Sequence, residues 1–324
     1  MRAVLVIGNL AIPSRLVLAP MAGISDLPYR MINRSFGCSC AFTEMISANA
    51  LAYGNRKTLD MLTGNADDRP LGVQLLGSDP FIIRRALEIL PAGAFDIIDF
   101  NAACPAPKVA AGMMGAALLR EPAKLQSLLQ ELVKNAPLPV TVKIRTGWDE
   151  ASINAVETAL RAQDAGVSAL TIHGRTARQG YSGRVDYGVI RRVKEALAIP
   201  VIASGDALTP ALVKKMFNET GCDAVALARG ALGNPWLFPD TERLLRGEGL
   251  SPRPGIHEVV RTMKEHLEGN IACRGEEGGV IRFRKFFVWY TKGLGVRRMN
   301  DRVFRAVSRD EILTLMNEVE ALLS

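Results

Sequence analysis

Eight short apolar runs, each ending in a polar or glycine-bearing turn, constrain the fold of this chain most strongly. They begin with "RLVLAPMAG" and end with "AVALARG", and between these come "AFTEMIS", "LGVQLLG", "FDIIDFNAA", "PVTVKIRTG", "ALTIHGRT" and "PVIASGD". Their nearly continuous hydrophobicity is typical of strands buried on both faces. Helix-length segments such as 122–136 and 151–166, with apolar residues three or four apart, separate most of them. Eight such units predict an α/β fold, a closed (β/α)8 TIM barrel.

The alternative is an open doubly wound sheet. Such a sheet usually carries G-x-G-x-x-G after a strand, and no apolar run here is followed by that motif. We therefore expect the barrel. Functional side chains of barrels lie at the carboxyl ends of the strands. The polar residues that this sequence places there are Gln74, Asn101, Lys143, Arg145, His173, Ser204, Asp206 and Arg229.

From about residue 240 the pattern changes. The turn-rich stretch "RGEGLSPRPG" precedes helix-like segments at 256–270, 279–292, 301–308 and 310–323, without strands. We expect two domains, a barrel over 1–243 and a small all-α domain over 244–324. Residues 282–309 hold nine Lys or Arg and one acid, a net +8, so the rest of this +7 chain sums to −1. A concentrated basic face indicates a polyanionic partner.

The cysteines and the hydropathy pattern bear on compartment. Five cysteines, an odd and scattered number, favour a reducing cytoplasm over a disulfide framework. Cys38 and Cys40 have no second Cys or His pair at zinc-like spacing, so we expect no metal. No apolar run reaches the ~18 residues that a membrane span needs. The start, "MRAVLVIGNL", is more typical of two short strands around a turn than of a signal peptide.

Two features of the strand ends suggest ligand chemistry. The loops "IASGDAL" and "LARGAL" lead into helices, so they are either a phosphate site or ordinary glycine-bearing turns. Lys143 lies in an apolar strand, where its ammonium needs a partner or a cavity. A cation there would stabilise an anionic reduced flavin, and Gln74 and His173 could bond the same ring. A single buried histidine is otherwise more often part of a core.

Cys104 follows the strand "FDIIDFNAA" and precedes Pro105 and Pro107. It could be a nucleophile, although the sequence identifies no activating partner. It could be a general acid, because a free thiol is mostly protonated at neutral pH. It could also be an inert small apolar residue. The prolines argue against the last role, since they stiffen a loop.

Several motifs together resemble the tRNA-dihydrouridine synthases, most closely the bacterial B-type branch. These motifs are "LAPMAGISDLPYR", "VQLLGSDP", "DFNAACPAPKV", "VKIRTGW", "TIHGRT" and "IASGDA", and the resemblance covers essentially the whole chain in order. It implies an FMN-binding barrel with a helical RNA-binding domain that acts on tRNA, and we expect a monomer. It also implies that NADPH reduces FMN, that hydride passes to C6 of a uridine, and that a cysteine protonates C5.

The resemblance assigns roles by motif. Cys104 would be the proton donor, Lys143 the cation beside the flavin, and Asn101 and Arg145 would face the uracil. Further cofactor contacts would be Pro20, Met21, Ala22, Gln74, His173, Ser204, Gly205, Asp206, Ala228 and Arg229. The residues expected to contact RNA are Arg284, Lys285, Arg297 and Arg298. The chain departs from the family pattern at Ala103 and Ala228, where glycine is usual, and at Phe286, where histidine is usual.

Two other functions fit parts of the sequence. A small-molecule FMN oxidoreductase on the same barrel would leave the basic helical segment unexplained. An RNA-binding protein with a decayed flavin site is suggested by Ala103 and Ala228. We expect the tRNA-modifying flavoenzyme.

Overall fold

The computed structural model describes residues 4–324 of the chain. Met1–Ala3, part of the stretch weighed above as a signal peptide, lie outside the described residues. The chain divides into two compact units, one of residues 1–26 with 38–228 and one of residues 27–37 with 229–324. The division falls at 228/229 and not at 243/244, and it assigns the early segment 27–37 to the second unit.

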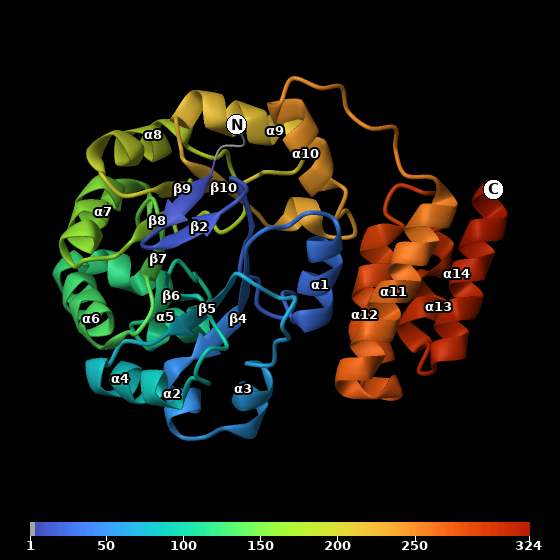
Figure 1. Ribbon diagram of the computed structural model, residues 1–324, viewed down its shortest axis with the longest axis horizontal. Coiled ribbons are helices and arrows are strands. Elements are labelled where there is room, and N and C mark those ends of the chain that lie inside the picture. Colours follow the sequence, from blue (N-terminus) through green and yellow to red (C-terminus); the bar gives the residue numbers. More distant parts are fainter. Residues whose placement is uncertain (1–3) are drawn as a thin grey trace. The chain divides into compact units, whose positions relative to one another are not determined.

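The first unit contains a closed barrel of eight parallel strands, which confirms the fold expected from the sequence (Figure 1). The order around the barrel is β10-β3-β4-β5-β6-β7-β8-β9. The strands are β3 (Leu16–Leu18), β4 (Ala41–Ser47), β5 (Leu71–Leu76), β6 (Ile97–Ala102), β7 (Val140–Arg145), β8 (Ala169–His173), β9 (Val201–Ser204) and β10 (Ala224–Leu227). Each coincides with one of the eight apolar runs.

Helices connect these strands. They are α2 (Ala48–Ala52), α3 (Arg56–Asp60), α4 (Pro80–Ile89), α5 (Pro107–Ala111), α6 (Pro122–Asn135), α7 (Ala155–Asp164), α8 (Tyr187–Ala196) and α9 (Pro210–Thr220), with the 3-10 turns η1 (Gly115–Arg120) and η2 (Glu150–Ser152). Local sequence fixes several of their ends. The Asp79 side chain accepts hydrogen bonds from the backbone N–H groups of Phe81 and Ile82 at the start of α4. Gly221, with φ +68°, ends α9 in the left-handed conformation.

A hairpin packs against the barrel interior. Strands β1 (Leu5–Ile7) and β2 (Leu10–Ile12) pair in antiparallel fashion around the turn at Gly8 and Asn9, as "IGNL" predicted. Leu5, Ile7 and Ile12 share one apolar cluster with inward-facing residues from the first half of several barrel strands, among them Val17, Phe42, Ile97, Ala169 and Ile202. The amino-terminal end of the barrel is therefore filled with apolar side chains.

Polar residues follow this apolar layer along the same inward faces. Side chains two residues apart on a strand point the same way, so Asp99 follows Ile97, Thr171 follows Ala169 and Ser204 follows Ile202. The change from apolar to polar occurs on neighbouring strands at matching depth, because the strands are paired in parallel register. The barrel interior thus becomes polar only towards its carboxyl end.

The second unit is all helical. It comprises α1 (Leu27–Ser35), η3 (Arg229–Ala231), α10 (Leu237–Leu245), α11 (Ile256–Arg274), α12 (Glu276–Tyr290), η4 (Arg297–Met299), α13 (Asn300–Arg305) and α14 (Arg309–Leu323). Its core is aromatic: Phe283, Phe286 and Phe287 are fully buried on α12. The Phe286 ring lies 4.3 Å from that of His266 on α11 and 5.5 Å from that of Tyr29 on α1. These contacts explain why α1 belongs to this unit.

Candidate active site

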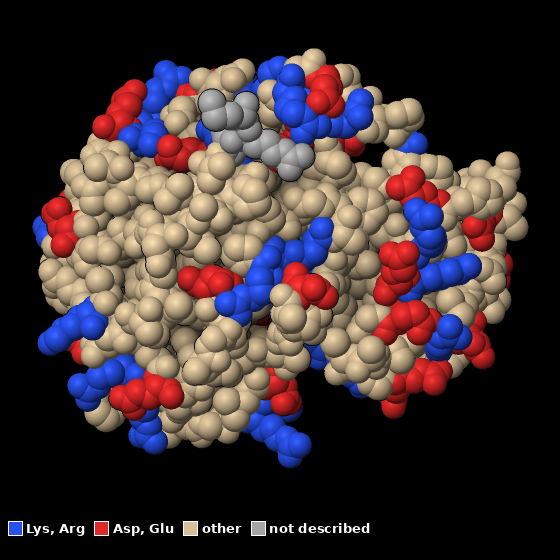
Figure 2. All heavy atoms as spheres, in the orientation of Figure 1, with Lys and Arg blue, Asp and Glu red and all other residues tan. Residues whose placement is uncertain are grey.

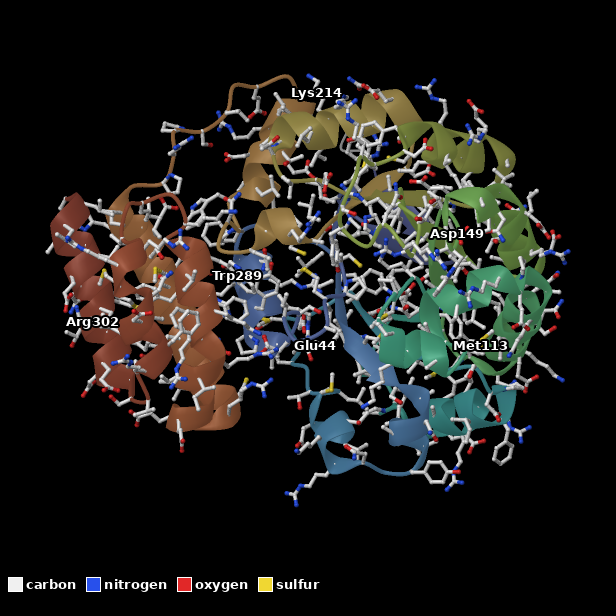
Figure 3. All side chains as sticks on the ribbon, turned by 180° about the vertical axis from the view of Figure 1, so that it is seen from behind. Glu44, Met113, Asp149, Lys214, Trp289 and Arg302 are labelled. Atoms are coloured by element: carbon white, nitrogen blue, oxygen red, sulfur yellow. The ribbon has the colours of Figure 1, made fainter. Side chains whose placement is uncertain are left out.

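The strand register brings the expected polar residues of β5 to β9 together at the carboxyl end of the barrel. Asn101 on β6 pairs with Lys143 on β7, Arg145 on β7 pairs with His173 on β8, and His173 pairs with Ser204 on β9. All of them are buried except Lys143, which is half-buried. Figure 3 shows the side chains from the opposite side to Figure 1, with Met113 labelled in the segment after β6 and Asp149 after β7.

Cys104 lies two residues beyond β6 and is half-buried. The Asn101 side-chain oxygen Oδ1 accepts hydrogen bonds from the backbone N–H of Ala103 (3.0 Å) and of Cys104 (2.8 Å). The Cys104 carbonyl oxygen accepts one from the backbone N–H of Ala116 (3.0 Å). The loop that carries the thiol is therefore held on both sides, as a reactive group needs.

Gly115 makes this loop geometry possible. Its φ is +59°, and a Cβ atom at this position would lie 2.6 Å from the Cys104 carbonyl oxygen and 3.1 Å from the Cys104 Cβ. Any side chain there would force the cysteine loop to move, so the glycine is a requirement of the site. Sequence reasoning did not single out Gly115, which stands among the small residues of "AAGMMGAALL" after Cys104.

Lys143 provides a positive charge in the polar interior. Burial above all, and then the neighbouring charge of Arg145, lower its pKa to about 8, and the nearby Asp99 partly opposes this shift. The protonated ammonium is thus costly in the protein alone and would gain from an anionic ligand. This behaviour fits the flavin-side role expected for Lys143.

Arg145 is 2 % exposed and bonds to backbone. Its Nε donates to the carbonyl oxygen of Ala103 (2.8 Å), and Nη1 donates to those of Thr176 (2.9 Å) and Gly180 (3.0 Å). Burial lowers its pKa to about 10. Arg145 therefore joins the cysteine loop to the loop after β8. That contact set differs from the uracil-facing role expected from the sequence, which stays a prediction.

The loops after β8 and β9 are joined by an ion pair that sequence reasoning missed. Arg175 is 2 % exposed, and its Nη1 and Nη2 donate to Asp206 Oδ1 (3.1 Å) and Oδ2 (2.5 Å). Asp206 has φ +49°, and Gly205 before it has φ +124°. A Cβ at Gly205 would lie 3.1 Å from the His173 ring. The residue pattern R-T after "HG" was quoted as a motif, but its partner in space could not be read from it.

The remaining expected cofactor residues lie beyond their strands. Pro20 and Met21 are half-buried and Ala22 is exposed after β3; Ile24 and Ser25 donate backbone hydrogen bonds to the Met21 carbonyl oxygen. Ala228 follows β10 in the first unit, and Arg229 begins η3 in the second. Among residues 4–324 only Met113 and Asp206 are non-glycine residues with positive φ, so Ala103 and Ala228 adopt their usual backbone region.

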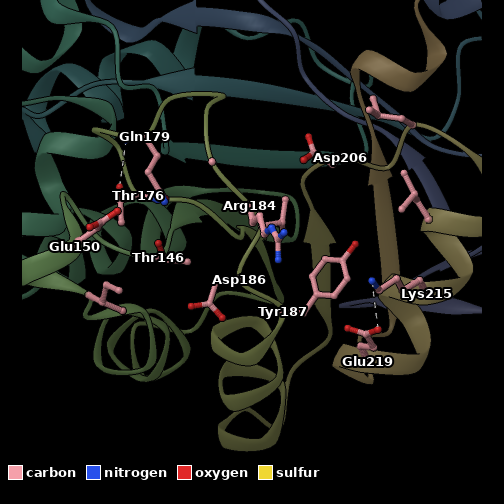
Figure 4. Close-up of a pocket in the computed structure, with 15 residues that line it drawn as sticks. Thr146, Glu150, Thr176, Gln179, Arg184, Asp186, Tyr187, Asp206, Lys215 and Glu219 are labelled. Atoms are coloured by element: carbon pink, nitrogen blue, oxygen red, sulfur yellow. Dashed lines mark hydrogen bonds and ion pairs between the residues drawn. The ribbon is translucent and has the colours of Figure 1, made fainter.

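A cavity of about 950 Å³ is lined by the segments that follow β7, β8 and β9 and by one side of α9, and Asp206 is among its lining residues (Figure 4). Its charged lining contains the acids Glu150, Asp186, Asp206 and Glu219 against the bases Arg184 and Lys215, a net −2. That charge disfavours a phosphate. The lining includes Asp206 from the expected residues but none of Cys104, Lys143 or His173. We therefore place the candidate site around Cys104, Lys143 and His173 and not in this cavity.

The four expected RNA contacts differ in accessibility. Arg284 is half-buried and its Nε donates to the Ala306 carbonyl oxygen (2.8 Å). Lys285 is half-buried, with its Nζ 5.2 Å from the Phe286 ring centre. Arg297 and Arg298 are both exposed in η4. Phe286 itself is fully buried, which excludes it from a surface contact.

Other basic side chains of residues 282–309 are paired with acids. Arg302 forms a two-bonded ion pair with Glu318 (2.6 Å each), and Arg309 Nε lies 2.7 Å from Glu268 Oε1. On the face of the second unit visible in Figure 2, basic and acidic side chains are interspersed. The segment's formal charge is therefore partly neutralised by acids outside it.

None of the helices of residues 4–324 is both long and apolar enough to cross a membrane. No cluster of three or more His, Cys, Asp or Glu side chains in that range could hold a metal ion.

A closed (β/α)8 barrel with polar groups gathered at its carboxyl end defines the class of protein, a barrel enzyme. Solved structures share this fold. A histamine dehydrogenase from Rhizobium sp. 4-9 matches with a TM-score of 0.59 and 12% identity, over 83% of this chain and 50% of that one. A 6-hydroxypseudooxynicotine amine oxidase from Pseudomonas geniculata N1 matches with a TM-score of 0.61 and 13% sequence identity. The match covers 86% of this chain and 54% of that one. This chain thus spans about half of each.

Sequence comparison defines the family. The model described as "Dihydrouridine synthase (Dus)" matches residues 17–322. The tRNA-dihydrouridine synthase B of Pseudomonas aeruginosa is 38% identical over 306 residues, covering 94% of this chain and 92% of the relative. The tRNA-dihydrouridine synthase B of Pasteurella multocida is 36% identical over 311 residues, covering 95% of this chain and 94% of the relative. The chain belongs to the dihydrouridine synthase family, which confirms the resemblance and the expectation of an enzyme.

Proposed function

We propose that this protein reduces uridine to 5,6-dihydrouridine in tRNA, with FMN as cofactor, NADPH as reductant and Cys104 as the proton donor to C5. The observation that carries the proposal is the half-buried Cys104 at the polar end of the barrel, whose backbone is held by Asn101, the residue that pairs with Lys143 on the next strand. Family membership and the relatives' names support the substrate.

The residues present fit FMN. The half-buried Lys143 and the amides of Gln74 and Asn101 supply a cation and polar groups for a pyrimidine-like ring. The Ser204–Gly205–Asp206 turn supplies a loop with positive φ at Gly205 and Asp206, a geometry that exposes backbone N–H groups to anions. FMN, when bound and reduced, supplies the hydride for C6 of the uracil ring.

The protein's own residues perform the other tasks. Cys104 holds the proton on its Sγ and releases it to C5. Asn101 and Arg145 keep the loop in place from its N–H and carbonyl sides. The apolar layer beneath Asp99 keeps water from entering through the amino-terminal end of the barrel. Uridine must leave its stack to reach such a site, which costs a few kcal/mol.

The helical unit is proposed to bind the tRNA in the cytoplasm. Arg297 and Arg298 are its exposed candidates, since phosphate contacts need accessible cations. Arg284 and Lys285 are half-buried and would contribute mainly through packing.

The test is nucleoside mass spectrometry on unmodified tRNA incubated with the purified protein, FMN and NADPH. Dihydrouridine should appear, and mapping the modified fragment gives its position. A yellow, NADPH-reducible protein that makes no dihydrouridine would contradict the proposal. Reduction of free uracil without RNA would favour the small-molecule oxidoreductase instead.

A further inference from the structure

A continuous chain of side-chain hydrogen bonds runs from the barrel interior to the cysteine loop. Gln74 Nε2 donates to Asp99 Oδ2 (2.6 Å), and Asn101 Nδ2 donates to Gln74 Oε1 (2.8 Å). Asn101 Oδ1 then accepts from the backbone N–H groups of Ala103 and Cys104. Asp99, Gln74 and Asn101 are 2 %, 1 % and 6 % exposed. We call this chain the amide relay.

The two ends of the amide relay impose one direction on it. A carboxylate only accepts hydrogen bonds, and a backbone N–H only donates. Gln74 must therefore turn its NH2 group towards Asp99 and its oxygen towards Asn101. Asn101 must turn its NH2 group towards Gln74 and its oxygen towards the cysteine loop. Reversing either amide would bring two donors or two acceptors together in a buried site, at a cost of about 1–3 kcal/mol.

We propose that Asp99 is a positioning residue, which anchors the amide relay and thereby fixes the backbone of the loop that carries Cys104. Thr141 Oγ1 donates to the second carboxylate oxygen, Oδ1 (2.6 Å), so both oxygens of Asp99 are engaged. Asp99 lies two residues before Asn101 on β6, and Asn101 Oδ1 lies 2.8 Å from the backbone nitrogen of Cys104.

A competing role for Asp99 is a counter-charge for Lys143. Among residues 4–324 no Lys143–Asp99 ion pair within 4.0 Å exists, and Asp99 acts on the pKa of Lys143 less than burial does. The relay and the counter-charge make different demands. The relay needs an acceptor atom facing Gln74, whereas the counter-charge needs a negative charge.

Three substitutions separate the hydrogen-bonding role of Asp99 from its role as a charge. Asp99→Asn removes the charge but can keep the relay, because its oxygen can accept from Gln74 while its NH2 donates to the Thr141 hydroxyl, which also accepts. Asp99→Leu has nearly the same shape and removes both charge and acceptor. Gln74→Met cuts the relay in its middle while Asp99 keeps its charge, and it replaces Asp99→Leu if that variant does not fold.

The experiment is residue-resolved amide hydrogen exchange on the full chain without added ligand, so its outcome does not depend on the proposed catalytic activity. In Asp99→Leu and Gln74→Met, exchange at Ala103 and Cys104 should rise about tenfold or more, the equivalent of one lost hydrogen bond. In Asp99→Asn it should stay within about twofold of the unaltered protein. Amides of Leu170 and Val201, which donate to backbone carbonyl or carboxylate oxygens elsewhere in the barrel, report global stability.

Equal acceleration in Asp99→Asn and Asp99→Leu would overturn the proposal in favour of the charge. Acceleration at Leu170 and Val201 as large as at Ala103 and Cys104 would also overturn it, because the role would then be general stability. Unchanged exchange at Ala103 and Cys104 in both relay-breaking variants would show that the loop is held by Arg145 and Gly115 alone.

Discussion

The barrel mouth and the basic segment of the helical unit look alike in the sequence, since both are series of polar residues. In the barrel, residues far apart in the chain converge, because parallel register places the ends of β6, β7, β8 and β9 side by side. In residues 282–309, neighbours in the chain diverge: Arg284 bonds a backbone carbonyl, Arg302 pairs with Glu318, and Arg297 is exposed. The position of a residue at a strand end predicts that its side chain will lie near those of the other strand ends. A count of basic residues does not predict which of them are exposed and free of an acidic partner.

The largest expected effect tests whether the polar residues gathered at the carboxyl end of the barrel form a catalytic site around Cys104. Cys104→Ala should lower dihydrouridine formation by about 100-fold or more, the usual contribution of a general acid. FMN binding and its reduction by NADPH should be retained, as followed by absorbance. Cys273→Ala, at an exposed cysteine on α11, is the matched control and should keep full activity. A Cys104→Ala protein that forms product at the normal rate would refute the proton-donor role.

The second prediction tests the close approach of Gly115 to the Cys104 carbonyl oxygen. Gly115→Ala should lower the free energy of unfolding by about 2–4 kcal/mol, since it adds a clash to an unfavourable φ. Gly93→Ala, with φ +71° but nothing within 4 Å of the added Cβ, should cost about 1 kcal/mol. Urea unfolding of both variants measures the difference. Equal losses would mean that the cysteine loop adapts freely.

The third prediction uses the contrast within the basic segment. Neutralising the exposed pair, Arg297→Gln with Arg298→Gln, should weaken tRNA binding about tenfold and reduce the salt slope of log K by about 1–2. Neutralising the paired side chains, Arg302→Gln with Arg309→Gln, removes the same formal charge but should change the slope less. Titrations at several salt concentrations decide this. A larger change for the paired set would place the RNA on α13 and α14.

The smallest effect concerns stability and pH. The pKa of Lys143 is lowered to about 8 in the folded protein from a usual 10.5, so the charged form destabilises the fold at and below pH 8. Lys143→Met should therefore raise the free energy of unfolding by about 1–3 kcal/mol near pH 7. The gain should shrink above pH 8 and vanish near pH 10.5. Thermal unfolding of the ligand-free protein between pH 6 and 10 measures it, and a pH-independent gain would attribute it to packing.

Much of the fold and part of the site could be predicted. Continuous apolar runs predicted all eight barrel strands, because burial on both faces leaves a direct pattern in sequence, and the turn in "IGNL" predicted the hairpin. The polar residues at the ends of the apolar runs correctly predicted that Gln74, Asn101 and His173 lie in the barrel strands near their carboxyl ends. Asp99 was within the same quoted strand and carried a signal, a buried acid two residues before Asn101, that was not used. Gly115, Arg175 and α1 gave no usable signal.

The sequence by itself determined the class of fold, the family and the presence of a cysteine at a strand end, because these depend on local periodicity and on motifs read in order. The tertiary structure alone decided which polar groups face one another. The Arg175–Asp206 pair, the three carbonyl contacts of Arg145 and the two side-chain bonds of Gln74 in the amide relay each join residues that lie 25 to 42 positions apart in the chain. Such contacts depend on barrel closure and register, which no single stretch of sequence encodes.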